Sequence, residues 1–431
     1  MINRRRFFNA MFAPAVLSAV GKAKAAPSPA AAPDPYPPMP EPEDPQYWDH
    51  IREQFYLNPE EAYFNTATIG AVPRPVLERV IEDMRVLQAT LTLWDFKPGT
   101  PDWISGYSPM TRLRAKLARL VNVEGRDIAL TQNSTFGMNF VANGIDLKRG
   151  DEVILTDREH PGGICGWQER AKKDGIVVKQ VHLPTPANDP GQLVQLFADA
   201  ITPRTRVLAF AHVIFSSGIV MPAKQLTKLA HDKGCLSVID GAQATGHIKV
   251  DLQDIGCDAY FSSPHKWLLA PPGNGYVYMK RDLQQRVWTT LASYAWGDDK
   301  DGMFRFMQYG TGNRSLLVGL DAALDFHFQI GHDRWINRIR FLADRLRSGL
   351  QHIPGAVISS PVNPELAGAV VLHRIQGVTA EDLQDQLWIQ KRIRVRSEGE
   401  DVGVRQACEI FNSEAEIDST LDLVRKLASK A

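Results

Sequence analysis

Two stretches decide the fold of this chain, Ser237-Val238-Ile239-Asp240-Gly241-Ala242-Gln243 and Ser262-Ser263-Pro264-His265-Lys266-Trp267. The first has β-branched apolar residues and ends at an acid, as expected of a buried strand. The second closes a short apolar strand, Ala259-Tyr260-Phe261-Ser262, which breaks at a proline. An acid thus ends one predicted strand, and a lysine follows the next.

This acid and lysine fit the chemistry of pyridoxal 5'-phosphate (PLP). Lys266 can form a Schiff base with PLP, and Asp240 can hold the pyridine nitrogen protonated. A lysine placed directly after an apolar strand is expected to be partly desolvated, which lowers its pKa and frees its amine as nucleophile and base. The ordinary alternatives are a solvated surface lysine and an aspartate that caps a helix.

Outward from these stretches, strands and helices alternate. The predicted strands cover 127–131, 152–156, 176–181, 206–211 and 236–240, and the helices between them cover 136–144, 163–173, 193–201 and 223–233. This order is typical of an α/β fold with a mostly parallel sheet and helices on both faces, where ligands bind at the carboxyl ends of the strands.

After Met279 the pattern changes. Two long helices over 316–330 and 333–352, short strands over 369–374 and 392–395, and a helix over 417–429 predict a smaller α+β domain. We therefore expect an N-terminal segment and large ligand-binding domain over 47–285, and a small C-terminal domain over 286–431.

Further candidates follow the other predicted strands. Asn133-Ser134-Thr135-Phe136-Gly137 opens a helix, where free N–H groups, the helix dipole and two hydroxyls can hold a phosphate. Ser263 and His265 can add phosphate contacts, and His160 can stack on a pyridine ring. Gln243 can reach the phenolic oxygen of PLP. Each of these residues also has a plain structural alternative, such as a helix cap or a loop histidine.

Composition narrows the possible partners of the 431-residue chain. It carries 49 basic and 49 acidic residues, so no net field favours nucleic acid or an anionic membrane. None of the four cysteines forms a Cys-x-x-Cys pair, and no metal site is predicted. The sequence leaves open whether a disulfide forms.

Residues 1–25 are predicted to be an export signal. Arg4-Arg5-Arg6 precedes two phenylalanines and a weakly apolar stretch that is too short to span a membrane. This resembles a twin-arginine signal, so we expect the twin-arginine export machinery as a partner and the periplasm as destination. A Sec signal or a disordered basic tail is the alternative. Residues 26–46 are rich in proline and predict an extended linker.

The chain resembles the class V aminotransferase family of fold-type I PLP-dependent transferases, through Asp240-Gly241-Ala242-Gln243, Ser263-Pro264-His265-Lys266 and Glu159-His160. The resemblance runs from Tyr63 to the C-terminus and is strongest to the isopenicillin N epimerase-like branch. With its twin-arginine signal, the chain is also similar to the periplasmic PLP enzymes that tailor peptide siderophores of the pyoverdine type.

The resemblance implies a role for each candidate. Lys266 would form the Schiff base, Asp240 would pair with the ring nitrogen, Gln243 would contact the phenolic oxygen, and His160 would stack on the ring. The phosphate would be held by Ser134, Thr135, Ser263 and His265. Gly310-Thr311-Gly312 would reach the phosphate of a neighbouring subunit, which implies a homodimer with shared active sites.

The resemblance also places the substrate, an amino acid or an amino-acid-bearing peptide. Arg396 and Arg405 compete to bind its α-carboxylate, a task that suits a guanidinium fork. Asn65 and Thr66 would line its pocket.

Two departures from the desulfurase members stand out. The loop Ser397-Glu398-Gly399-Glu400-Asp401 has no thiol, which argues against persulfide chemistry. Phe215 stands where desulfurases have an asparagine, a contact that Ser216 or Ser217 would have to replace.

These features predict an enzyme that acts at the substrate Cα and leave the outcome open. Transamination and epimerisation share the same lysine and acid. A non-catalytic PLP-fold protein that binds a ligand is the alternative from another class.

Overall fold

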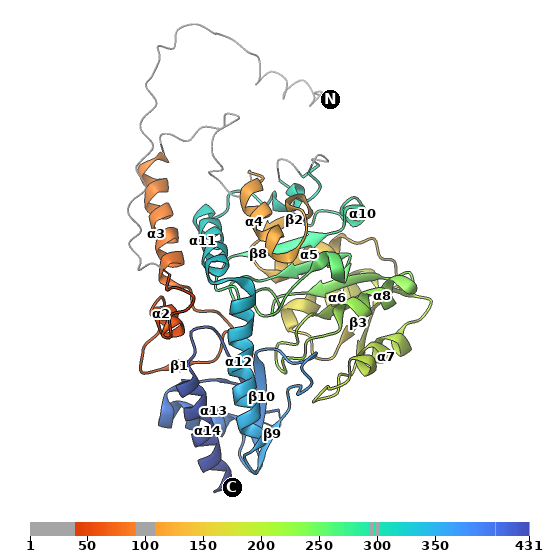
Figure 1. Cartoon of the computed structure of the whole chain (residues 1–431). Coiled ribbons are helices and arrows are strands. Elements are labelled where there is room, and N and C mark those ends of the chain that lie inside the picture. Colours follow the sequence, from red (N-terminus) through yellow and green to blue (C-terminus); the bar gives the residue numbers. More distant parts are fainter. Residues whose placement is uncertain (1–38, 92–107, 294–295, 298–300, 401, 431) are drawn as a thin grey trace, which may run out of the picture. The chain divides into compact units, whose positions relative to one another are not determined.

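The computed structural model of the protein describes residues 39–91, 108–293, 296–297, 301–400 and 402–430 (Figure 1). The predicted signal peptide and most of the predicted linker lie outside these residues. All four cysteines are free thiols, of which Cys165 is exposed and the other three are buried. Within the described ranges, no helix is long and apolar enough to cross a membrane.

A seven-stranded sheet forms the centre of the protein, in the order β2-β8-β7-β6-β5-β3-β4. Neighbouring strands are parallel except at β8, which is antiparallel to both β2 and β7. Burial along the whole of β2, β3, β7 and β8 shows that both faces are covered. The predicted α/β fold with a mostly parallel sheet is confirmed. The strands are β2 (Ile128–Thr131), β3 (Glu152–Thr156), β4 (Val177–Val181), β5 (Thr205–Ala211), β6 (Leu236–Asp240), β7 (Ala259–Ser262) and β8 (Gly275–Met279).

Several helices around this sheet begin at polar caps that the sequence contains. Asn133 Oδ1 accepts a hydrogen bond from Phe136 N–H (3.1 Å), so α5 begins two residues before the predicted start. His160 caps α6 in the same way, with Pro161 as the first helical residue. These helices are α4 (Thr111–Val121), α5 (Ser134–Gly144), α6 (Pro161–Asp174), α7 (Pro190–Ala200), α8 (Ala223–Asp232), α9 (Leu252–Ile255) and α10 (Arg281–Gln284); the 3-10 turns are η2 (Gly125–Asp127) and η3 (Phe304–Met307).

The C-terminal part is built on a four-stranded antiparallel sheet, in the order β12-β13-β10-β9. Figure 1 shows α12 running beside β9 and β10, with α14 next to it, and α13 packs on α14. The smaller C-terminal sheet of the prediction is therefore present. Its strands are β9 (Ala356–Ile358), β10 (Val370–Ile375), β12 (Arg396–Ser397) and β13 (Val404–Ala407), and its helices are α11 (Arg314–Ile330), α12 (His332–Gln351), α13 (Ala380–Lys391) and α14 (Glu414–Ala428).

The strand predicted over 392–395 is present as the shorter β11 (Ile393–Arg394), which pairs in parallel with β1 (Ala62–Tyr63) of the N-terminal segment. The next strand, β12, begins after the predicted range and pairs with β13. The N-terminal segment also contains α2 (Tyr47–Arg52) and α3 (Arg74–Ala89), and α3 packs along α11 (Figure 1).

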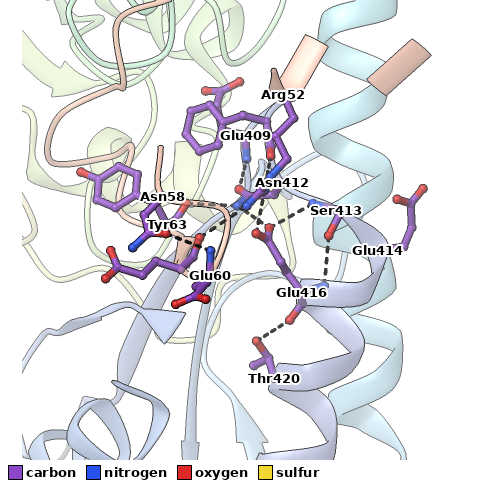
Figure 2. A network of polar contacts seen from close by, with 12 residues as sticks. Arg52, Asn58, Glu60, Tyr63, Glu409, Asn412, Ser413, Glu414, Glu416 and Thr420 are labelled. Atoms are coloured by element: carbon purple, nitrogen blue, oxygen red, sulfur yellow. Dashed lines mark hydrogen bonds and ion pairs between the residues drawn. The ribbon is translucent and has the colours of Figure 1, made fainter. Parts of the chain in front are cut away.

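A polar network fastens the N-terminal segment to the C-terminal part (Figure 2). Asn412 Nδ2 donates to Tyr63 O (3.1 Å) and to Glu416 Oε2 (3.0 Å), and Asn412 Oδ1 accepts from Glu409 N–H (2.9 Å). Arg52 Nη1 lies 2.6 Å from Glu416 Oε1. Because Asn412 is buried, these partners replace water, and the chain just after Tyr63 is held against the C-terminal sheet.

Replacing Asn412 with alanine should lower the free energy of unfolding by about 2 kcal/mol, because buried groups at Tyr63 and Glu409 lose their partner. Urea unfolding of the PLP-loaded protein measures this change. Asn337→Ala is the matched control, since Asn337 is exposed on α12 and should change stability by less than about 0.5 kcal/mol. Equal effects of the two substitutions would contradict the fastening role.

Candidate active site

A cavity of about 260 Å³ lies at the carboxyl ends of the parallel strands. Strands β2, β3, β5, β6 and β7 run in one direction, so the residues that follow them meet at one edge of the sheet. The structure brings most of the predicted site residues to this cavity: Ser134, Thr135, His160, Asp240, Gln243, Ser263, His265, Lys266, Arg396 and Arg405.

The remaining predicted residues lie elsewhere. Asn65 lies behind the cavity lining, Thr66 is fully buried, and Thr311 is exposed and outside the lining of its own chain's cavity. Their assigned roles stay predictions. Phe215, which stands where desulfurases have an asparagine, lines the cavity. Ser216 and Ser217, the two residues that would have to replace that contact, do not line it.

Asp240 and Lys266 share the inner wall of the cavity. Asp240 Oδ1 accepts a hydrogen bond from Ala242 N–H (2.8 Å). A Cβ atom at Gly163 would lie 2.7 Å from Asp240 Oδ2, so only glycine lets the first turn of α6 approach the carboxylate this closely. Burial raises the pKa of Asp240 and lowers the pKa of Lys266 to about 8, while the attraction between their opposite charges opposes both shifts.

One end of the cavity is suited to an anion. Ser134, the first residue of α5, donates its N–H to Ser263 Oγ (2.9 Å), which in turn donates to Ser134 Oγ (3.0 Å). His265 Nδ1 is buried, and within the described ranges nothing hydrogen-bonds to it. An unpartnered buried nitrogen beside two hydroxyls at a helix start, those of Ser134 and Ser263, fits the phosphate of PLP.

His160 and Gln243 form two further walls. His160 Nδ1 accepts from Gly162 N–H (3.0 Å), so the neutral ring carries its proton on Nε2. Desolvation and the positive charges of Lys266 and the two arginines lower the pKa of His160 to about 4, so it is neutral at pH 7. Gln243 Nε2 donates to Ala67 O (2.8 Å) and Oε1 accepts from Trp267 Nε1 (2.7 Å), which leaves one amide proton for a ligand.

The two arginines lie opposite each other on β12 and β13. Thr68 Oγ1 accepts from Arg405 Nη2 (2.8 Å) and from Arg396 Nη1 (3.3 Å), and Asn65 Oδ1 accepts from Arg405 Nη2 (3.0 Å). The N-terminal segment therefore reaches the cavity through Thr68 and supports Arg405 through Asn65.

Sequence reasoning missed three polar residues. Thr68 contacts both arginines and lies two residues after the predicted Thr66. Glu398 belongs to the loop that lacks a thiol, and its Oε1 lies 2.9 Å from Arg405 Nη1. Glu159 Oε1 accepts from Thr156 Oγ1 (2.6 Å), and burial with some repulsion from Asp240 raises its pKa to about 7. Nothing in the local sequence indicates where these side chains point.

Comparison with known proteins agrees with this geometry. Residues 105–421 match the family described as aminotransferase class V. The chain belongs to this family. It is 31% identical over 402 residues to isopenicillin N epimerase of Amycolatopsis lactamdurans, covering 88% of this chain and 98% of that protein. It is 26% identical over 357 residues to a probable cysteine desulfurase of Methanothermobacter thermautotrophicus, covering 81% and 86%.

The fold match is equally broad. A mutant of the cystine C–S lyase C-DES, solved with glycine covalently linked to PLP, has a TM-score of 0.78 at 25% identity, covering 87% of this chain and 98% of that one. The class V aminotransferases depend on PLP, and the residues of the cavity fit this cofactor. The fold-type I assignment and the cofactor are thus confirmed.

The lowered pKa of Lys266 has a kinetic consequence. As pH rises through about 8, the Lys266 amine loses its proton, so attachment of PLP to the apo protein should become faster, well below the ordinary lysine pKa of about 10.4. In Asp240→Asn the midpoint should move to lower pH, because the carboxylate that favours the ammonium is gone. Stopped-flow measurement of the visible PLP absorbance gives both midpoints.

Asp232→Asn is the control, since Asp232 is exposed on α8 and should leave the midpoint unchanged. A midpoint near the ordinary lysine value in the wild type, or an upward shift in Asp240→Asn, would contradict this assignment.

Proposed function

We propose that the protein is a PLP-dependent enzyme that acts at the Cα of an amino acid or of an amino-acid-bearing peptide metabolite. The observation that carries this proposal is the juxtaposition of Lys266, Asp240 and a solvent-accessible arginine, Arg396, in one cavity. Transamination is the activity that we favour from the family, and epimerisation is the alternative, supported by the 31% identity to isopenicillin N epimerase.

PLP supplies an electron sink for charge that develops at the substrate Cα. Asp240 would hold the proton on the ring nitrogen, and its buried position would strengthen that interaction. Lys266 Nζ, whose pKa is about 8, is deprotonated in about a tenth of the molecules at pH 7 and can then remove the Cα proton. An arginine at the cavity wall binds the carboxylate and thereby orients the Cα–H bond.

The fate of the proton separates the two outcomes. A proton delivered to Cα from the face opposite Lys266 inverts the configuration, whereas transfer of the amine leaves Cα without a proton. His160 lines the cavity and is edge-on to Phe215, with ring centroids 5.1 Å apart. Because its pKa is lowered to about 4, His160 is neutral at pH 7 and is a poor proton donor there.

Persulfide chemistry is not proposed. The loop after Arg396 offers serine, glycine and carboxylates but no thiol, and Glu398 from this loop contacts Arg405 instead.

Exchange in deuterated water tests the proposal. Amino acids and short peptides incubated with PLP-loaded protein should gain deuterium at Cα, which mass spectrometry detects, and chiral chromatography and carbonyl trapping then separate epimerised from transaminated products. Lys266→Ala should lose both the visible absorbance and the exchange. Lys233→Ala, an exposed lysine at the end of α8, should retain both.

A colourless, folded wild type that cannot be reconstituted with PLP would overturn the proposal. A coloured wild type without exchange on any amino acid or peptide would exclude Cα chemistry and leave the ligand-binding alternative.

We also propose that the protein is exported to the periplasm by the twin-arginine pathway and works there as a homodimer, with siderophore tailoring as its role. The arginines at 4–6 support export, and the exposed apolar residues Met84 and Val86 on α3, with exposed Thr311, support a second copy.

Lysine at both Arg4 and Arg5 should retain the protein in the cytoplasm, as cell fractionation would show. Unchanged periplasmic recovery would count against this route, and Lys22→Arg, which keeps the charge outside the motif, is the control.

A further inference from the structure

His247 is a buried histidine that does not line the cavity, yet both of its ring nitrogens are engaged. Nε2 accepts a hydrogen bond from Ala369 N–H (2.5 Å), so the proton of the neutral ring is on Nδ1, which donates to Gln243 O (2.8 Å). Burial lowers the pKa of His247 to about 3, so the ring keeps this tautomer at pH 7. One backbone group just before β10 and one in the turn after β6 therefore hold the imidazole.

The chain before β10 approaches His247 closely enough for this contact. A Cβ atom at Gly368 would lie 2.7 Å from His247 Nε2, so a larger residue at this position would push the two apart. Ala369 O accepts in turn from the N–H of Cys408 (3.0 Å), the residue that follows β13. The C-terminal sheet thus anchors the histidine.

The same imidazole lies flat on Trp267, the residue after Lys266. The two ring centroids are 3.8 Å apart and the planes differ by 14°. Trp267 is fully buried, and its Nε1 donates to Gln243 Oε1 (2.7 Å). His247 therefore contacts both ends of this hydrogen bond, the indole through its face and Gln243 through its backbone carbonyl.

This hydrogen bond determines which way the Gln243 amide points. Oε1 faces the indole N–H, and Nε2 uses one of its two protons on Ala67 O (2.8 Å). The flipped amide would set N–H against N–H at Trp267 and oxygen against oxygen at Ala67. Gln243 lines the cavity and can therefore offer its remaining amide proton there, but no acceptor from Oε1.

We propose that His247 and Trp267 are positioning residues that hold the Gln243 amide as a hydrogen-bond donor toward the phenolic oxygen of PLP. This inference rests on the cofactor and on the predicted contact of Gln243, not on the substrate or the reaction proposed above. The phenolic oxygen carries its full negative charge only after the neighbouring Schiff-base nitrogen has lost its proton. A fixed donor stabilises that charge, so it should lower the pH at which the proton leaves.

A pH titration of the visible absorbance of the PLP-loaded protein, without substrate, measures this proton loss. His247→Phe keeps an aromatic ring on Trp267 but loses both hydrogen bonds, so the midpoint should rise by about one pH unit. Gln243→Ala should raise it by a similar amount. Adding His247→Phe to Gln243→Ala should give no further rise, because both act through the same amide.

Two further variants complete the test. Trp267→Phe removes the indole N–H and keeps a ring for His247, so it should also raise the midpoint, which tests the proposal even if His247→Phe does not fold. His352→Phe is the matched control. His352 is exposed, and its Nδ1 donates to the carbonyl oxygen of Ser348 (2.7 Å), four residues earlier, as His247 does to Gln243. It should leave the midpoint unchanged.

An unchanged midpoint in either folded variant, His247→Phe or Trp267→Phe, would overturn the inference. An additive rise in the double variant would also overturn it, because His247 would then act by a route other than Gln243. Absence of PLP absorbance in the wild type would defeat the proposed function as well, whereas an unchanged midpoint defeats this inference alone, so the two failures are distinguishable.

Discussion

The placement of opposite charges at the ends of two adjacent parallel strands is the constraint on which the rest of the site depends. Asp240 ends β6 and pairs in register with Phe261 of β7, and Lys266 follows β7 after one short turn. Burial raises the pKa of Asp240 and lowers the pKa of Lys266, and the attraction between the two charges opposes both shifts. The parallel direction of β6 and β7 makes this arrangement possible, because an antiparallel pair would place the two groups at opposite edges.

The cavity is completed by segments far apart in the sequence. The N-terminal segment comes close because Gly70 N–H donates to His265 O (2.9 Å), and a Cβ at this position would lie 2.1 Å from Lys266 O. The C-terminal sheet supplies Arg396 and Arg405 through β12 and β13. Asn412 and Arg52 fasten these two parts to each other, so packing outside the cavity fixes the position of the residues that line it.

Local sequence was enough for the strands that end at the cavity. Strands β3, β6 and β7 have the predicted bounds, because apolar runs buried on both faces are interrupted by turn residues. Local sequence did not predict β13, where Arg405 and Gln406 are both buried and apolar residues do not alternate with polar ones. It also did not predict α13, because the apolar stripe of this helix is short. The partners of Arg405 could not be predicted from the sequence either, because Asn65, Phe215 and Glu398 come close to it only in the folded chain.

Arg405 links the N-terminal segment, the chain after β5 and the loop between β12 and β13. Redesign of this loop must therefore take account of Arg405. A replacement that introduces a thiol at position 398 would remove the anion opposite Arg405 Nη1. The buried positive charge of Arg405, near Lys266, would then lack its counter-charge. The engineer would have to supply another acceptor or remove the arginine in the same step, so the loop and its anchor can be exchanged only together.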